Sequence, residues 1–94
     1  MLNNYETIYI VNAQLEEDDL KSVVEKINGL LQKSSQVESI DEWGKRKMAY
    51  PINDINEGYY VFANFASEPQ FPKELERVYK ITDGILRYLV IKKS

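Results

Sequence analysis

The chain has 94 residues, with 15 acidic and 12 basic side chains and a formal net charge of −3. A core of this size fits one domain, and we expect residues 1–94 to form it. The sequence contains no cysteine and no histidine. Because most metal sites and hydrolytic mechanisms use sulfur or imidazole groups, we expect no catalysis, no metal, no cofactor and no small-molecule substrate.

The amino-terminal residues carry neither a basic leader nor a long apolar run, so we expect a cytoplasmic protein that does not enter a membrane. Charge is unevenly distributed along the chain. Residues 1–43 carry nine acids and three bases, a balance of −6, whereas residues 44–94 carry six acids and nine bases, a balance of +3. Any contact with nucleic acid should therefore come from the second half.

The first half of the chain predicts a strand followed by a helix. Residues 5–11 are rich in β-branched and aromatic side chains, which favours a strand with both faces partly covered. Four consecutive acids at residues 16–19 precede apolar side chains at the three-and-four spacing of an amphipathic helix. We interpret the acids as a match to the positive end of the helix, because the ligand spacing of a calcium loop is missing.

The next segment predicts two strands joined by a turn. Residues 37–50 read as the first of them, with a bend or bulge at Gly44. Pro51 cannot donate to a ladder and residues 53–58 are rich in turn formers, so the chain should reverse there. Residues 59–66 then return as the next strand. We expect its core-facing side chains to be Tyr59, Val61, Ala63 and Phe65.

The last segment predicts a helix over residues 71–82, with Pro72 in its first turn and Gly84 just beyond its end. Residues 85–91 form an apolar strand that is interrupted by Arg87. The whole order predicts an α+β fold, a ferredoxin-like βαββαβ sandwich in which a four-stranded antiparallel sheet carries two helices on one face. The other face stays open, so its aromatic residues should meet solvent, a partner protein or RNA. Candidates for this position are Tyr60 and Phe62.

Three consecutive cations, Lys45, Arg46 and Lys47, stand inside the second predicted strand of this acidic chain. Arginine can bridge a phosphate with two donors or stack on a base, whereas lysine acts as a mobile point charge. Tyr50 supplies a flat ring close by. A basic triplet can also serve only to keep a hairpin soluble and to discourage edge pairing, so the triplet alone does not decide its function.

The wider segment from Trp43 to Ile52 reads Trp-Gly-Lys-Arg-Lys-Met-Ala-Tyr-Pro-Ile. It resembles the bacterial small-subunit ribosomal protein S-six family, in which a glycine, basic residues, a leucine, Ala-Tyr and an isoleucine occupy this strand. The resemblance extends over the whole chain, from the Tyr5-Glu6 strand to the final lysines. Met48 stands where leucine is usual, which is a near-isosteric exchange.

The resemblance implies a structural, non-enzymatic protein of the cytoplasmic ribosome. It implies binding to the central region of small-subunit ribosomal RNA together with the small basic ribosomal protein S-eighteen. By motif position, the implied RNA or partner contacts are Lys45, Arg46, Lys47 and Tyr50, to which we add Arg87. A basic partner would supply the positive charge that this acidic chain lacks, and the open sheet face or its edge could dock it.

An RNA recognition motif has the same element order and is an alternative for single-stranded RNA binding. Its register disagrees with this sequence, because Tyr60 stands where a small residue is expected, and Val61 and Asn64 stand where aromatics should stack. An enzymatic or regulatory ferredoxin-like domain is a third possibility. No phosphate-cradling glycine loop is visible for it, since each separate glycine fits a turn or bend, namely Gly44, Gly58 and Gly84.

Overall fold

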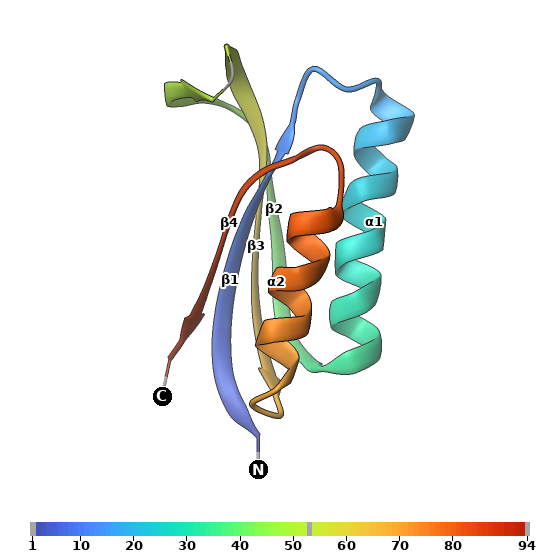
Figure 1. Cartoon of the computed structure of the whole chain (residues 1–94), viewed down its shortest axis with the longest axis vertical. Helices are drawn as coiled ribbons and strands as arrows, with labels where there is room; N and C mark the ends of the chain where they lie inside the picture. Colours follow the sequence, from blue (N-terminus) through green and yellow to red (C-terminus); the bar gives the residue numbers. More distant parts are fainter. Residues whose placement is uncertain (1, 53, 94) are drawn as a thin grey trace.

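The computed structural model describes residues 2–52 and 54–93. The elements in chain order are β1 (Asn3–Asn12), α1 (Glu17–Ser34), β2 (Gln36–Ile52), β3 (Ile55–Ser67), α2 (Phe71–Ile81) and β4 (Ile85–Lys92). The strands form one antiparallel sheet in the order β2-β3-β1-β4. Both helices cover the same face of this sheet, and the opposite face is open (Figure 1). The predicted ferredoxin-like sandwich is confirmed.

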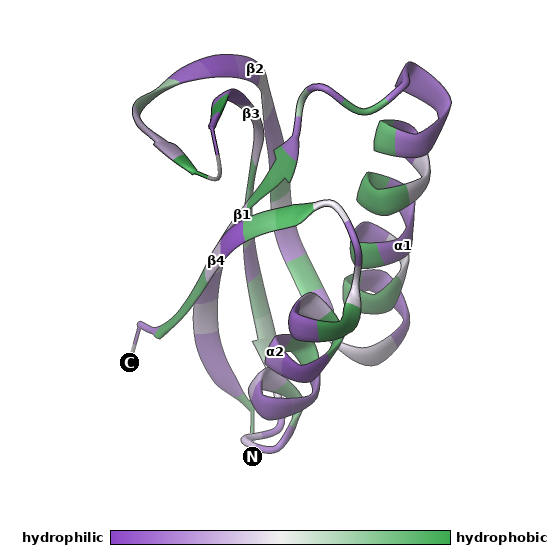
Figure 2. Cartoon of the chain, turned by 45° about the horizontal axis from the view of Figure 1, so that its top comes forward, coloured by the Kyte–Doolittle hydropathy of each residue, from purple (hydrophilic) through white to green (hydrophobic). Residues whose placement is uncertain are grey.

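The hydrophobic core lies between the helices and the sheet. Both helices turn an apolar stripe toward the sheet and a polar side toward solvent (Figure 2). In α1 the buried positions follow the predicted spacing, and they are Leu20, Val24, Ile27 and Leu31. The predicted core set of β3 is confirmed for Val61, Ala63 and Phe65, while Tyr59 is only partly buried. Each large apolar side chain buried in this way contributes roughly 1.5–3 kcal/mol to folding. No helix of the described part of the chain is long and apolar enough to cross a membrane.

Two buried phenols tie the helices to β1. The hydroxyls of Tyr79 in α2 and Thr7 in β1 lie 2.9 Å apart, and Thr7 donates to the carbonyl oxygen of Leu89 at 2.9 Å. Since the single hydroxyl proton of Thr7 is used in that bond, Tyr79 donates to Thr7. The Tyr9 hydroxyl donates to Oδ1 of Asn28 in α1 at 2.8 Å. Both helices are thereby fixed in register against the sheet as well as packed on it.

The turn between β2 and β3 is shorter than the sequence predicted. Residues 53–58 were expected to form it, but β3 already begins at Ile55, which pairs with Ile52. Asp54 takes a positive φ of 64°, a conformation that aspartate tolerates in tight turns. Gly58 is therefore a strand residue, and its expected place in a turn is wrong. Asn53 lies outside the described residues.

Two of the three register shifts between β2 and β3 lie in the part of the hairpin nearer its turn. The pairing register shifts between Glu42 and Gly44, and Gly44 has a φ of 85°, so the predicted bulge is confirmed. At a second shift, Lys47 pairs with Glu57 and the next pair is Ile52 with Ile55. Four residues of β2, 48–51, therefore lie opposite a single residue of β3, Asn56. The end of the hairpin consequently curves away from the helices, toward the open side of the sheet (Figure 1).

Candidate functional site

The open face gathers apolar side chains from neighbouring strands. Ile8 in β1 is paired with Phe62 in β3 on one side and with Leu89 in β4 on the other. Two residues further along β1, Ile10 is paired with Tyr60 of β3. Since cross-strand partners point to the same face, these side chains form one surface. They border a hollow of about 330 Å³, which we call the sheet hollow.

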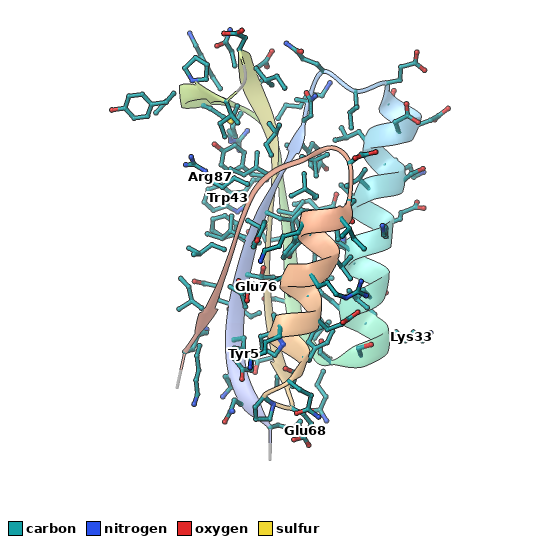
Figure 3. All side chains as sticks on the ribbon, in the orientation of Figure 1. Tyr5, Lys33, Trp43, Glu68, Glu76 and Arg87 are labelled. Carbon is teal, nitrogen blue, oxygen red and sulfur yellow. The ribbon has the colours of Figure 1, made fainter. Side chains whose placement is uncertain are left out.

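Trp43 forms one wall of the sheet hollow. Its indole stacks on Phe62 with ring centroids 4.1 Å apart, and its Nε1 donates to Oδ2 of Asp41 at 2.9 Å. The side chain is nevertheless 44% exposed. Trp43 and Arg87 both lie on the side of the sheet away from the helices (Figure 3). A large aromatic ring is thus held in a fixed position while one of its surfaces remains available to a partner.

The hairpin borders a second, smaller hollow of about 200 Å³, which we call the hairpin hollow. Its lining combines residues 48–52 of β2 with Ile10, Tyr60 and Arg87. Met48 is buried there, whereas the ring of Tyr50 is 83% exposed. Arg87 lines both hollows. The fold therefore brings together two of the predicted site residues that are far apart in the sequence, Tyr50 and Arg87.

The three predicted cations stand at the base of the hairpin. Lys45, Arg46 and Lys47 are all exposed, and none of them forms an ion pair within residues 2–52 and 54–93. Among the described residues, the Arg46 side chain donates only to the carbonyl oxygen of Lys45, at 3.3 Å. The alternation of strand side chains points Lys45 to the same face as its partner Tyr59, which is the helix side, and Arg46 to the opposite face. The triplet lines neither hollow, and by the same alternation Arg46 points to the side of the hollows whereas Lys45 and Lys47 point to the helix side.

The open face does not present aromatics in the register of an RNA recognition motif. Val61, which stands at a stacking position of that motif, is fully buried against the helices. The aromatic rings that line the sheet hollow on the open face include those of Trp43, Tyr60 and Phe62. Phe62 is already stacked under Trp43. The side chains at the open face are therefore arranged for apolar contact more than for a row of stacked bases.

Comparison with known proteins decides the family. The family model described as Ribosomal protein S6 matches residues 4–92. The chain belongs to the ribosomal protein S6 family. Small ribosomal subunit protein bS6 of Clostridium novyi (strain NT) is 50% identical over 91 residues, which cover 96% of each chain. Small ribosomal subunit protein bS6 of Caldanaerobacter subterraneus subsp. tengcongensis is 48% identical over 92 residues, which cover 97% of each chain.

The fold agrees with a solved member of the S6 family. The crystal structure of 30S ribosomal protein S6 from Thermotoga maritima matches with a TM-score of 0.90 and 26% sequence identity, covering 99% of this chain and 89% of that one. The predicted family is confirmed, and the chain is a structural protein of the small ribosomal subunit in the cytoplasm. The S6 family is one of ribosomal proteins, and no catalytic activity is indicated for it.

Sequence reasoning did not single out five of the residues that line the sheet hollow of this S6 family member, namely Ile8, Ile10, Trp43, Tyr88 and Leu89. In the sequence, Ile8 and Ile10 alternate with Thr7, Tyr9 and Val11, which was a usable signal for the face of Ile8. Trp43 carried a weaker one, because it directly precedes the glycine at which the strand bulges. Leu89 could be placed only through its pairing with β1, since its own strand is apolar on both faces.

Proposed function

We propose that this protein binds the central region of small-subunit ribosomal RNA jointly with the small basic ribosomal protein S-eighteen. Its net charge of −3 disfavours RNA binding by bulk electrostatics, which needs many cations facing phosphates. A basic partner would supply that charge. The observation that carries the proposal is the uncovered apolar hollow on the open sheet face, together with a cluster of cations in the adjoining strand that form no ion pair within residues 2–52 and 54–93.

The sheet hollow suits the protein partner. Contiguous exposed apolar surface on a soluble protein marks interaction sites, and aromatic residues dominate the binding energy at such sites. Trp43, Phe62 and Tyr60 supply these rings, and their positions are fixed by stacking and by pairing within the sheet. Arg87 adds a charged group at the border, where it can bond to a carbonyl or carboxylate of the partner.

The hairpin suits the RNA. Arg46 can engage a phosphate with two parallel N–H donors, and the neighbouring Lys45 and Lys47 add point charges. Tyr50 offers an exposed ring on which an unpaired base can stack, and Arg87 lies across the same hairpin hollow. Both kinds of contact are concentrated at one end of the sheet, so one RNA segment could use them together with the docked partner.

Replacing Lys45, Arg46 and Lys47 together by alanine should weaken binding to a ribosomal RNA fragment in the presence of protein S-eighteen. If each cation meets one phosphate, the slope of log affinity against log salt should fall by about 2 to 3 units. Thermal unfolding should change little, because all three side chains are exposed. Filter binding at several salt concentrations, with thermal melts of each variant, measures both quantities.

The matched control replaces Lys26, Lys33 and Lys80, three exposed cations of the two helices, by alanine. It changes the net charge by the same amount without altering the hairpin. We expect it to leave the salt slope close to that of the unmodified protein. If both triple variants lost affinity equally, the hairpin cations would act only through net charge, and their assignment as RNA contacts would be wrong.

Trp43→Ala should mainly affect the protein partner. Removing an aromatic anchor from the centre of an interface typically costs about 2 kcal/mol or more of binding free energy, about thirtyfold in affinity. The loss of its stacking on Phe62 should lower the free energy of unfolding by only about 1 kcal/mol. Calorimetric titration with protein S-eighteen measures the first effect, and Ile81→Ala, which removes an exposed apolar side chain of α2, is the control. Equal affinities of the two variants would exclude the sheet hollow as the docking site.

A further inference from the structure

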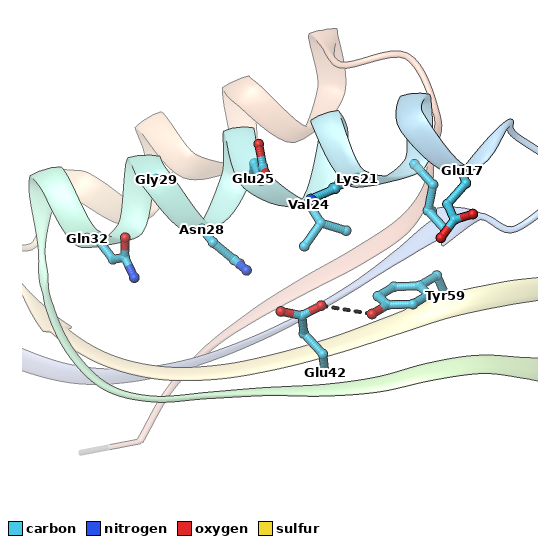
Figure 4. Close-up of a pocket in the computed structure, with 10 residues that line it drawn as sticks. Glu17, Lys21, Val24, Glu25, Asn28, Gly29, Gln32, Glu42 and Tyr59 are labelled. Atoms are coloured by element: carbon cyan, nitrogen blue, oxygen red, sulfur yellow. Dashed lines mark hydrogen bonds between the residues drawn. The ribbon is translucent and has the colours of Figure 1, made fainter.

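A groove separate from both hollows lies between α1 and the outer strand β2 (Figure 4). Its volume is about 530 Å³, and Leu20 and Val24 of α1 provide apolar surface within it. The charged side chains that line it are three carboxylates and one ammonium, namely Glu17, Glu25, Glu42 and Lys21. The groove therefore combines an apolar surface with net negative charge, which is complementary to a long basic side chain whose stem is aliphatic.

Glu42 is held in place inside this groove. The Tyr59 hydroxyl donates to Oε1 of Glu42 at 2.8 Å, and this hydrogen bond raises the pKa of Tyr59. Figure 4 shows the carboxylate between the strand and α1. Oε2 has no hydrogen-bond partner within residues 2–52 and 54–93 and can accept from an incoming cation. A glutamate on an exposed strand would otherwise sample several rotamers, so this acceptor is preorganised.

The backbone next to the groove is also unpaired. β2 is at the edge of the sheet, and its pairing partner is β3 on the inner side. Its first part, residues 36–43, contains no base and three acids, which are Glu38, Asp41 and Glu42. An edge strand of this length presents N–H and C=O groups that can pair with another extended chain. Glu42 belongs to both features, so a chain on this edge would place side chains in the groove.

We propose that an extended segment of a partner protein, rich in lysine or arginine, adds to the outer edge of β2 and inserts basic side chains into the α1–β2 groove. Alternate residues of a strand point to the same face, so every second side chain of the segment would face α1. There its charged end meets Glu25 or Glu42 while its stem packs on Leu20 and Val24. A second copy of this chain and an RNA strand are both disfavoured, because each would bring negative charge to a negative surface.

This surface is distinct from the open face and from the hairpin, so the inference goes beyond the function proposed above and can be tested without RNA. The probe is a capped eight-residue peptide that alternates lysine and valine, titrated into the ¹⁵N-labelled protein. We expect saturable shifts of backbone amides in residues 36–43 and of the α1 residues that line the groove. A peptide of equal charge with proline in place of valine cannot donate at those positions and should bind about tenfold more weakly.

Variants distinguish binding in the α1–β2 groove from general electrostatic attraction between the peptide and the protein. Glu25→Gln with Glu42→Gln should weaken binding of the lysine–valine peptide about fivefold, whereas Glu57→Gln with Glu76→Gln, an equal charge change outside the groove, should have little effect. Tyr59→Phe keeps the charge but frees Glu42, and it should weaken binding by a smaller factor. The proposal would be overturned if the two pairs of glutamine substitutions had equal effects, or if the proline peptide bound as tightly as the lysine–valine peptide. It would also be overturned if the shifts were confined to the open face, or if a single-stranded oligonucleotide caused stronger shifts than the peptide.

Discussion

Raising the pH from 10 to 11 is expected to lower the free energy of unfolding by about 2 kcal/mol, because two phenols that stay protonated in the folded core lose their protons in the unfolded chain. Tyr9 and Tyr79 are 0% and 1% exposed. Burial raises the pKa of both well above the usual 10.0, since the charged form would lose its hydration. In the unfolded chain the two groups titrate near 10. Stability is therefore constant with respect to these groups below about pH 9 and falls as the pH rises toward their higher folded-state values.

The measurement is urea unfolding followed by circular dichroism at pH 8, 10 and 11. Tyr79→Phe removes one of the two groups and should halve the loss between pH 10 and 11, to about 1 kcal/mol. At pH 8 the same variant should be about 1 kcal/mol less stable, because the hydrogen bond to Thr7 is lost. Tyr50→Phe is the control, since that ring is 83% exposed, and it should keep the full loss. An undiminished loss in Tyr79→Phe would contradict the role assigned to this phenol.

The fold could be predicted from the sequence because its signals are local. The spacing of Leu20, Val24, Ile27 and Leu31 is that of one helix face, and the alternation of residues 59–66 is that of a strand. Right-handed crossovers then leave few ways to arrange the elements. The turn after β2 was placed less well, because residues 53–58 are rich in turn formers whereas Ile55, Glu57 and Gly58 here pair with β2. Tertiary pairing overrode their local preference.

The candidate site could be predicted only in part. The basic triplet, Tyr50 and Arg87 could be singled out by residue type, but their neighbourhood depends on the register between strands. The hairpin hollow is bordered by Met48 and Tyr50, which lie within the second register shift of β2, and by Arg87 of β4, and no spacing in the sequence encodes that neighbourhood. The α1–β2 groove depends on how far the helix stands from the sheet edge. That distance is set by core side chains and not by the residues that line the groove.

Gly58→Ala is expected to lower the free energy of unfolding by about 1–2 kcal/mol and to displace the hairpin. A Cβ atom at this position would lie 2.3 Å from Cγ2 of Ile10 and 3.4 Å from Sδ of Met48, far closer than van der Waals contact allows in the first case. Ile10 is 7% exposed, so it cannot move freely into solvent. Overpacking of this kind costs about 1–3 kcal/mol, and the lower chain entropy of alanine offsets only about 0.5–1 kcal/mol of it.

Two controls make the test of Gly58 specific. Gly29→Ala should instead raise the free energy of unfolding by about 0.5–1 kcal/mol, because that glycine lies within α1 and its added Cβ would have no atom within 4 Å. In an Ile10→Ala background the cost of Gly58→Ala should fall close to zero, since Cγ2 is gone. Urea unfolding of the four proteins of this cycle measures the coupling between the two positions. If the effects of the two substitutions on the free energy of unfolding were additive, the close approach of β3 to Ile10 would not be the reason that position 58 needs glycine. The curvature of the hairpin over the open face would then require another cause.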